Sequence, residues 1–242
     1  MAGSDDDVRY PVDAPGWAAL DRVLSAAHSS RTPHQFTSKT GYDLDSPNPL
    51  PAITVFEGRG PSPDSGYWHY VTYGLTELFE KSSPQPEISG FGFELTFRLP
   101  RGEDEATPPT WPLRMLQGLG QYVLAGHGTF DTGHIVDLGG SIVPPAEPES
   151  TRTVLEGVVA VPDPSVGKIE TPHGTVLLLL LFGLTRAELE AMGSWDLARK
   201  VGLVGEVAPL GITQVGRAPY EEDPQKAPMY RRYALGVLAG EL

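Results

Sequence analysis

Large apolar side chains alternate with small or polar ones near the middle of the chain. Every second position is apolar and large: Phe91, Phe93, Leu95, Phe97 and Leu99. Successive side chains of a β-strand point to opposite faces, so this period of two predicts a strand with one buried face. We therefore expect the Phe91–Leu99 ladder to form part of the core of a sheet-containing domain.

Further strands are expected on both sides of this ladder. The run Val176–Phe182 has seven apolar residues, whereas a membrane-spanning helix needs about twenty, so we interpret it as a buried, central strand. This strand is expected to span Gly174–Phe182, and the other strand-like segments are apolar or aromatic and end at turn residues: Ile53–Glu57, Tyr67–Tyr73, His134–Leu138, Val154–Val161 and Ile212–Val215.

A few helices are expected between the strands. Pro15 opens one amphipathic helical pattern, and a second such pattern runs from Pro112 to Leu124. Thr185 and Glu188 form a capping box, which predicts a short helix that ends near Gly193. A further short helix is expected from Ser194 or Asp196 to Val201, and the polar, proline-bearing segment 31–51 is expected to be loop. Strands mixed with helices, without regular alternation, predict an α+β domain with a mixed central β-sheet and a few flanking helices.

Composition divides the 242 residues into three parts. Residues 1–13 form an acidic N-terminal tail, residues 14–217 one domain, and residues 218–242 a charged, proline-containing linker with a short C-terminal extension. We expect a helix or a strand within Met229–Leu242.

Charge and composition exclude several classes of function. The formal net charge of −13 opposes binding to nucleic-acid phosphates and favours a basic partner. Without cysteine, disulfides, thiolate metal sites and cysteine nucleophiles are excluded. The acidic N-terminus has no apolar core typical of a secretory signal, and no apolar run reaches membrane-spanning length. The sequence predicts a cytoplasmic protein that binds no membrane.

Chemistry-bearing residues do not form a convincing catalytic pattern. His127, Asp131 and His134 have spacings that could surround a metal, but they lie in a glycine-rich stretch that holds no ligands on one helix face. His69 lies among aromatic residues, which indicates a packed structural histidine, and Glu94 is a lone carboxylate without the second one that acid–base hydrolysis requires. We therefore predict no catalytic site, no metal and no cofactor.

A binding surface is predicted instead around residues 121–134. Tyr122 and Phe130 flank a glycine-rich turn after the second helix, and aromatic groups beside exposed backbone suit capture of a peptide as an added strand. The alternative is that both rings simply cover the core.

Several of these segments together resemble the suppressor-of-fused (SUFU) domain. The resemblance rests on WHYVTYGLTEL (68–78), GFGFELTFRL (90–99), PPTWP (108–112) and the helix that ends near QYV (121–123). It implies the fold of the N-terminal SUFU domain, in a bacterial-type single-domain member, and a protein that binds other proteins rather than a catalyst.

The resemblance also points to particular residues. In animal members of the family an extended segment of a Gli transcription factor is gripped as an added strand between two domains. Tyr122 matches a tyrosine of that site and Phe130 a neighbouring phenylalanine. His134 stands where those members have an acidic residue, and Asp131 is displaced by three positions. The resemblance thus implies a partner-binding site at Tyr122, Phe130, Asp131 and His134, but not the same peptide.

The leading hypothesis is a non-enzymatic domain that binds a protein or an extended peptide. Bacterial relatives are often placed among immunity proteins of polymorphic toxin systems, so the resemblance implies a partner such as a basic toxin. Two alternatives are a metal-dependent enzyme around His127, Asp131 and His134, and a general peptide-binding scaffold.

Overall fold

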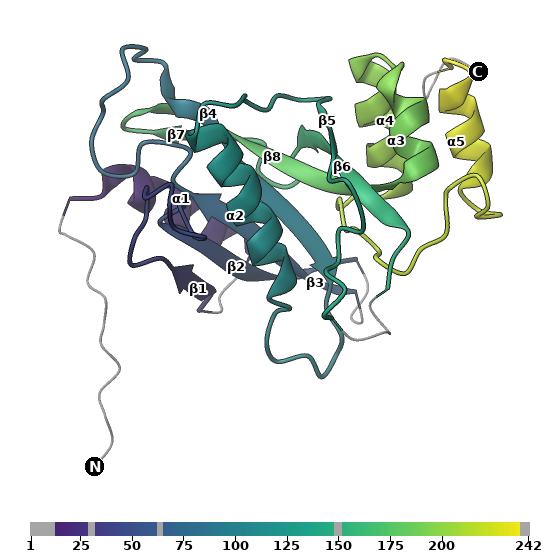
Figure 1. Cartoon of the computed structure of the whole chain (residues 1–242), viewed down its shortest axis with the longest axis horizontal. Coiled ribbons are helices and arrows are strands. Elements are labelled where there is room, and N and C mark those ends of the chain that lie inside the picture. The colour runs from purple at the N-terminus through teal and green to yellow at the C-terminus, as the bar shows by residue number, and fades with distance from the viewer. Residues whose placement is uncertain (1–12, 29–31, 62–64, 148–151, 238–242) are drawn as a thin grey trace.

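A single sheet forms the centre of the molecule, and helices lie against its two faces (Figure 1). The computed structural model describes residues 13–28, 32–61, 65–147 and 152–237. Its helices are α1 (Pro15–His28), α2 (Trp111–Leu124), α3 (Arg186–Gly193), α4 (Leu197–Val207) and α5 (Ala227–Ala234). Its strands are β1 (His34–Thr37), β2 (Ala52–Arg59), β3 (Gly66–Tyr73), β4 (Ile88–Pro100), β5 (Ile135–Asp137), β6 (Leu155–Pro162), β7 (Lys168–Thr171) and β8 (Gly174–Thr185).

The sheet is mixed, as the sequence predicts. Within the described residues its strand order is β1-β2-β3-β4-β8-β6-β5, and β7 pairs with β8 beside this path. Only the central β4–β8 pair is parallel, with Leu95 opposite Leu179, and every other described pair is antiparallel. The α+β class is confirmed, with β8 in the interior of the sheet.

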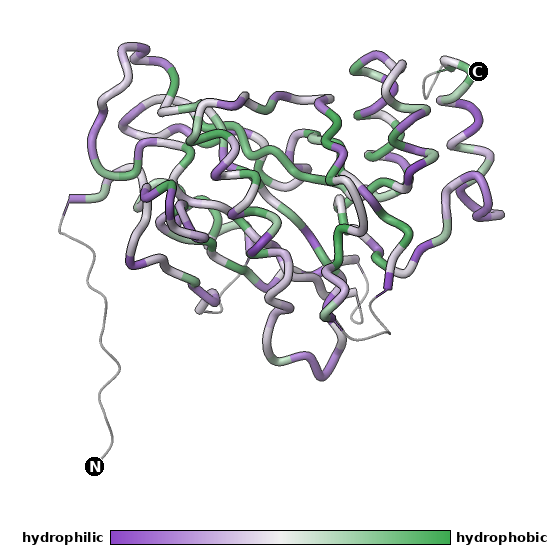
Figure 2. Tube along the Cα trace, viewed as in Figure 1, coloured by the Kyte–Doolittle hydropathy of each residue, from purple (hydrophilic) through white to green (hydrophobic). Residues whose placement is uncertain are grey.

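The apolar residues of β8 explain how the helices are layered. Leu179 and Leu181 face the core that α2 covers, whereas Leu178 faces α1, and Leu180 and Phe182 face α4 and α5. A strand buried on both faces has no position for a polar side chain, which is why the run is continuously apolar. In Figure 2 the apolar colour accordingly runs through the middle of the molecule.

Strand β4 differs from its prediction in two ways. From Phe93 onwards both of its faces are buried, including the one that carries Glu94, Thr96 and Arg98. Phe91, predicted to be in the core, is 44% exposed. The register between β4 and β8 shifts between Ile88 and Phe93, so the period of two fails at the start of the strand.

The polar face of β4 is held by buried interactions. Arg98 donates to both carboxylate oxygens of Asp163 at 2.8 Å, and His69 lies 3.1 Å from the same carboxylate. The other ring nitrogen of His69 is 2.9 Å from His28 at the end of α1. Burial, with the nearby Arg98, lowers the pKa of His69 to about 3, so the ring is neutral near pH 7. His69 is therefore the structural histidine that the sequence predicts.

Three local predictions were wrong. Segment 31–51 is not all loop, since β1 pairs with β2 at the edge of the sheet. Residues Ile212–Val215 do not form a strand; instead Thr213 binds the main chain of Arg98 and Gly183 with hydrogen bonds. The helix expected to end at Val201 continues to Val207, although Asp196 caps it as predicted.

The C-terminal part of the chain packs against the sheet's helical layer. Tyr220, Tyr230 and Tyr233 are buried in one cluster with residues of α3, α4, β6 and β8, so α5 lies against α4. The predicted tail lies outside the described residues except for residue 13, as do residues 238–242 of the predicted extension. None of the described helices has the length and hydropathy to cross a membrane.

Candidate partner-binding groove

The end of α2 sets the position of the first candidate residue, Tyr122. The N–H of Gly126 donates to the carbonyl of Val123, and the N–H of His127 donates to the carbonyl of Tyr122. Together these bonds form a Schellman motif, which requires a left-handed residue, and Gly126 has φ +74°. The chain therefore reverses directly after α2 and brings Phe130 back towards Tyr122.

Tyr122 and Phe130 form a stacked aromatic pair. Their ring centroids are 5.9 Å apart, and Phe130 in turn packs edge-on against Phe93 of β4 at 6.2 Å. Phe130 is buried, whereas Tyr122 remains 43% exposed. Phe130 thus belongs to the core as well as to the site, and Tyr122 is the member of the pair that a partner can contact.

A tight turn precedes β5 and carries the other two candidates. The N–H of Asp131 donates to Nδ1 of His134 at 3.2 Å, and the N–H of His134 returns to the carbonyl of Asp131 at 3.1 Å. The first bond uses Nδ1 as an acceptor, so a neutral His134 carries its proton on Nε2. Both side chains are exposed, and the Asp131 carboxylate accepts from the N–H of Thr132.

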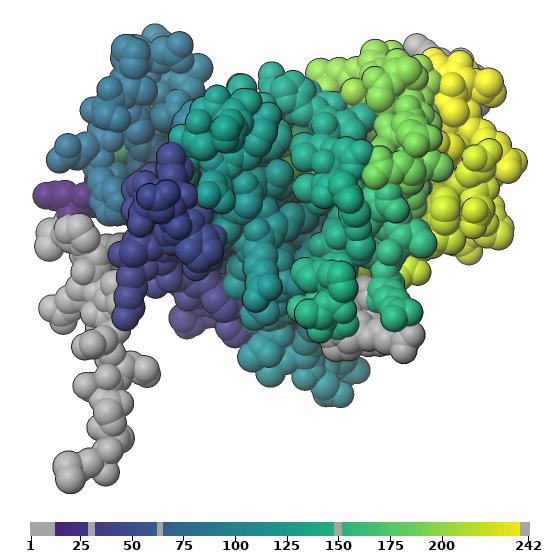
Figure 3. All heavy atoms as spheres, viewed as in Figure 1, coloured from purple at the N-terminus to yellow at the C-terminus, as the bar shows by residue number. Residues whose placement is uncertain are grey.

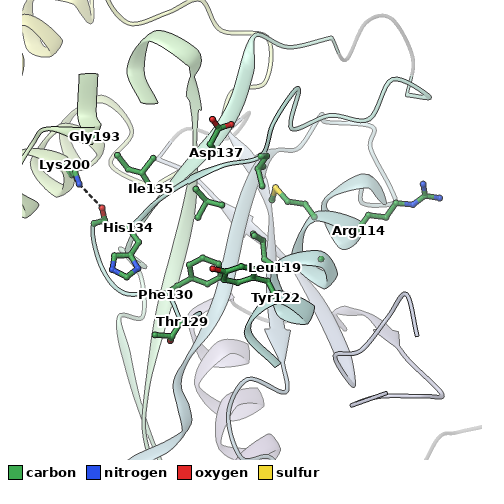
Figure 4. Close-up of a pocket in the computed structure, with 15 residues that line it drawn as sticks. Arg114, Leu119, Tyr122, Thr129, Phe130, His134, Ile135, Asp137, Gly193 and Lys200 are labelled. Carbon is green, nitrogen blue, oxygen red and sulfur yellow. Dashed lines mark hydrogen bonds between the residues drawn. The ribbon is translucent and has the colours of Figure 1, made fainter. Parts of the chain in front are cut away.

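These elements border an open groove of about 910 Å³ (Figure 4). One wall is α2 with Leu119 and Tyr122, the opposite wall is β5, and Lys200 of α4 closes one side. The groove joins three of the four candidates, Tyr122, Phe130 and His134, whereas Asp131 does not line it. Lys200 is fixed by a 3.0 Å hydrogen bond from its ammonium to the carbonyl of Gly133, the dashed line in Figure 4.

The wall formed by β5 is also the edge of the sheet. β5 pairs with β6 on one side, and no described strand lies on its other side. Leu138 donates to the carbonyl of Glu156 on β6. Antiparallel pairing alternates along a strand, so the main-chain groups of Ile135 and Asp137 face away from β6. An extended segment lying in the groove would meet these groups.

Sequence reasoning did not identify Met115, Ile135 and Lys200 as lining residues. They come from α2, β5 and α4, and only the tertiary fold brings these elements together. The amphipathic stripe of α2 was visible in the sequence, but nothing in it distinguishes a groove-lining residue from a core residue.

The geometry gives no support to a metal-dependent enzyme. Within the described residues no three His, Asp or Glu side chains are grouped closely enough to hold a metal ion. His127, Asp131 and His134 are therefore not brought together as a ligand set, and His127 lies instead beside the ring of Tyr122 at 5.7 Å.

Comparison with known proteins places this fold in a family. The family model described as "Suppressor of fused protein (SUFU)" matches residues 46–218. The chain belongs to the suppressor-of-fused family. The human and mouse suppressor of fused homologues are each 32% identical to it over 208 residues, which cover 79% of this chain and 41% of theirs. The chain therefore spans less than half the length of these relatives.

Solved structures of the suppressor-of-fused family have the same fold. A Sufu–Fu complex contains a chain that matches with a TM-score of 0.78 at 24% identity, over 93% of this chain and 98% of that one. Drosophila Suppressor of Fused matches with a TM-score of 0.77 at 25% identity, over 95% of this chain and 57% of that one. A SUFU homologue from Neisseria gonorrhoeae gives a TM-score of 0.53 at 16% identity, over 84% and 96%. Membership of this family fits protein binding.

Proposed function

We propose that this chain binds a protein partner by taking an extended segment of it into the groove between α2 and β5. The observation that carries the proposal is the position of an edge strand beside an open groove with an exposed aromatic ring. Strand addition supplies main-chain hydrogen bonds, which give affinity, while pockets for alternate side chains give specificity. The existence of a Sufu–Fu complex supports a protein partner for this fold.

Tyr122 is the proposed anchor of the interaction. It projects from α2 over Phe130, so its ring is held in place by stacking before a partner arrives. Rigid aromatic side chains lose little entropy on binding and are common among the residues that dominate binding energy. His134 adds a hydrogen-bond donor on the opposite wall, at its free Nε2.

A basic toxin is one partner that would fit this proposal. The net charge of −13 would steer a positively charged protein towards the chain and raise its association rate. In that case the chain would act as an immunity protein in the cytoplasm, by covering the toxin's surface in a stoichiometric complex.

The first test is affinity capture of partners from a host lysate with tagged wild-type protein and a tagged Tyr122→Ala variant. A specific partner should co-purify with the wild type in near-equal stoichiometry. Its affinity for Tyr122→Ala, measured by calorimetry, should fall at least about tenfold, as for a central aromatic anchor. The melting temperature should change little, because 43% of the Tyr122 surface is exposed and the ring lies at the edge of the core.

Leu235→Ala is the matched control for this experiment. Leu235 is 82% exposed and lies just after α5, and it does not line the groove. Its variant should bind as the wild type does. Equal binding of the partner by wild type and Tyr122→Ala would refute the groove as the site.

A further inference from the structure

A second surface, which shares no lining residue with the groove, lies at the C-terminal end of α2, where Leu124 lines it. We call it the Phe91 pocket; it has a volume of about 500 Å³. It lies beside the loop 76–87, which stands out at one end of the molecule in Figure 3. The described residues that line it are mostly apolar or small, among them Tyr42, Leu75, Phe91 and Leu124.

Two glycines aim Phe91 into this surface instead of into the core. Gly90 has φ +55° and Gly92 has φ +85°, conformations that other residues rarely adopt. They flank Phe91 within the irregular start of β4, where the N–H of Phe91 binds the carbonyl of Leu75 at 2.9 Å. Bulges of this kind re-aim side chains near functional sites. Here a phenylalanine that strict alternation would bury is turned outwards.

Exposed apolar side chains lie in and near the pocket. Of the large hydrophobic residues that are exposed in the described part of the chain, Tyr42 and Phe91 line the pocket, and Leu44 and Ile88 follow or precede them within three residues in the sequence. Leu44 lies close to α2, since its carbonyl accepts a 2.8 Å hydrogen bond from Gln121. Clustering of this kind is unusual on a surface that contacts only water.

The walls of the pocket are fixed before any ligand binds. The carboxylate of Glu77 accepts hydrogen bonds from the N–H groups of Ser82, Ser83 and Gly90 and from the ammonium of Lys81. Although partial burial opposes it, these donors hold the pKa of Glu77 below its ordinary value. Glu77 thus ties the two ends of the 77–90 loop together, and binding would cost little ordering of this loop.

The charges around the pocket indicate which charge a ligand should carry. Among the described lining residues the charged side chains are Glu77 and Glu80, and Asp43 follows directly after Tyr42. Lys81 lies close by, but its ammonium is already bound to Glu77 and to the carbonyl of Ile88. The surface therefore offers apolar contact with the negative charge of Glu80 at its rim.

We infer that the Phe91 pocket binds a peptide segment in which a large apolar side chain is flanked by lysine or arginine. The apolar side chain would pack against Phe91 and Leu124, and the cation would pair with Glu80. A second copy of this chain is a poor occupant, because two chains of net charge −13 repel each other.

The test uses a phage-displayed library of random peptides of about twelve residues, selected on the full chain and counter-selected on Phe91→Ser. Selected peptides should combine an aromatic or aliphatic residue with neighbouring Lys or Arg. A fluorescein-labelled peptide of this kind should bind Phe91→Ser at least about tenfold more weakly than wild type. Glu80→Lys should also weaken binding, and the difference should shrink in high salt, because exposed charges are screened.

Controls separate this surface from the groove. Tyr122→Ala and Leu235→Ala should bind the same peptide as the wild type does, so failure of the groove proposal would leave this result unchanged. The inference is overturned if no selected peptide depends on Phe91, or if the selected peptides lack basic residues. It is also overturned if sedimentation shows that wild type forms a dimer that Phe91→Ser abolishes.

Discussion

Glu94 is held in the middle of the sheet by hydrogen bonds. Its carboxylate accepts from the hydroxyls of Thr72 and Thr76 and from the N–H groups of Gly74 and Thr76, at 2.6–3.0 Å. In the described part of the chain it belongs to no ion pair. Burial disfavours the charged form more than these bonds favour it, and it raises the pKa of Glu94 to about 7 from an ordinary value of 4.5.

A pH dependence of stability follows from this shift. Because the pKa is higher in the folded state, the folded chain keeps its proton over a range where the unfolded chain has lost it. The free energy of unfolding should therefore fall as the pH rises from about 4.5 to about 7, by up to about 3 kcal/mol. Glu94→Gln, which stays uncharged, should flatten this fall. Urea unfolding of both proteins at about pH 5 and about pH 8 measures the difference.

Glu94→Ala is the companion variant. It leaves two hydroxyls and two N–H groups without an acceptor, so it should be less stable than Glu94→Gln at both pH values, by about 2–4 kcal/mol. Identical pH slopes for wild type and Glu94→Gln would show that Glu94 does not titrate in this range.

At the scale of elements, the sequence predicts β4 but not its surroundings. Alternation identifies the strand because the period of two follows from backbone geometry alone. The burial of Arg98 and Glu94 could not be predicted in this way, because it depends on how other parts of the chain, such as the turn that carries Asp163, pack on this face. The outward turn of Phe91 depends on the positive φ angles of Gly90 and Gly92. Glycine can adopt such angles but does not require them, so the sequence alone does not predict the turn.

The same limit applies to the groove. Tyr122, Phe130 and His134 lie within a short stretch around one turn, and local pattern together with family resemblance was enough to select them as candidates. Lys200 is brought to the groove by the packing of α4, whose position depends on the fold of the C-terminal half. Candidates from one segment could be proposed from the sequence, whereas lining residues that meet only through the tertiary fold could not.

Two phenylalanines of β4 provide a test of this account. Phe97 is fully buried and packs edge-on against Trp111 at 5.6 Å, whereas Phe91 is half exposed. Phe97→Ala should lower the free energy of unfolding by about 3–5 kcal/mol, and Phe91→Ala by less than about 1 kcal/mol. Denaturant unfolding of both variants gives the comparison. Similar losses at the two positions would contradict the assigned burial.

At the scale of the whole molecule, the helical layer is closed by the C-terminal segment. Arg199 of α4 donates to the carbonyls of Tyr233 and Ala234 at 2.8 and 2.9 Å, and so satisfies the end of α5. Tyr230 packs against Trp195 at 5.7 Å, and Arg232 pairs with Glu206. The segment that composition marks as a linker and extension therefore contributes buried side chains to the layer over β6 and β8.

Removal of residues 219–242 should consequently destabilise the remaining domain. The deletion takes away Tyr220, Tyr230 and Tyr233 and uncovers apolar residues of α4, so the truncated chain should lose several kcal/mol of its unfolding free energy or fail to fold. Tyr233→Ala isolates one contact and should cost about 3 kcal/mol, whereas Leu235→Ala, on an exposed side chain two residues later, should cost less than about 0.5 kcal/mol. Denaturant unfolding followed by circular dichroism measures all three. If the truncated chain is as stable as the full one, α5 does not stabilise the domain. In that case Tyr233→Ala and Leu235→Ala should lower the free energy of unfolding by the same small amount.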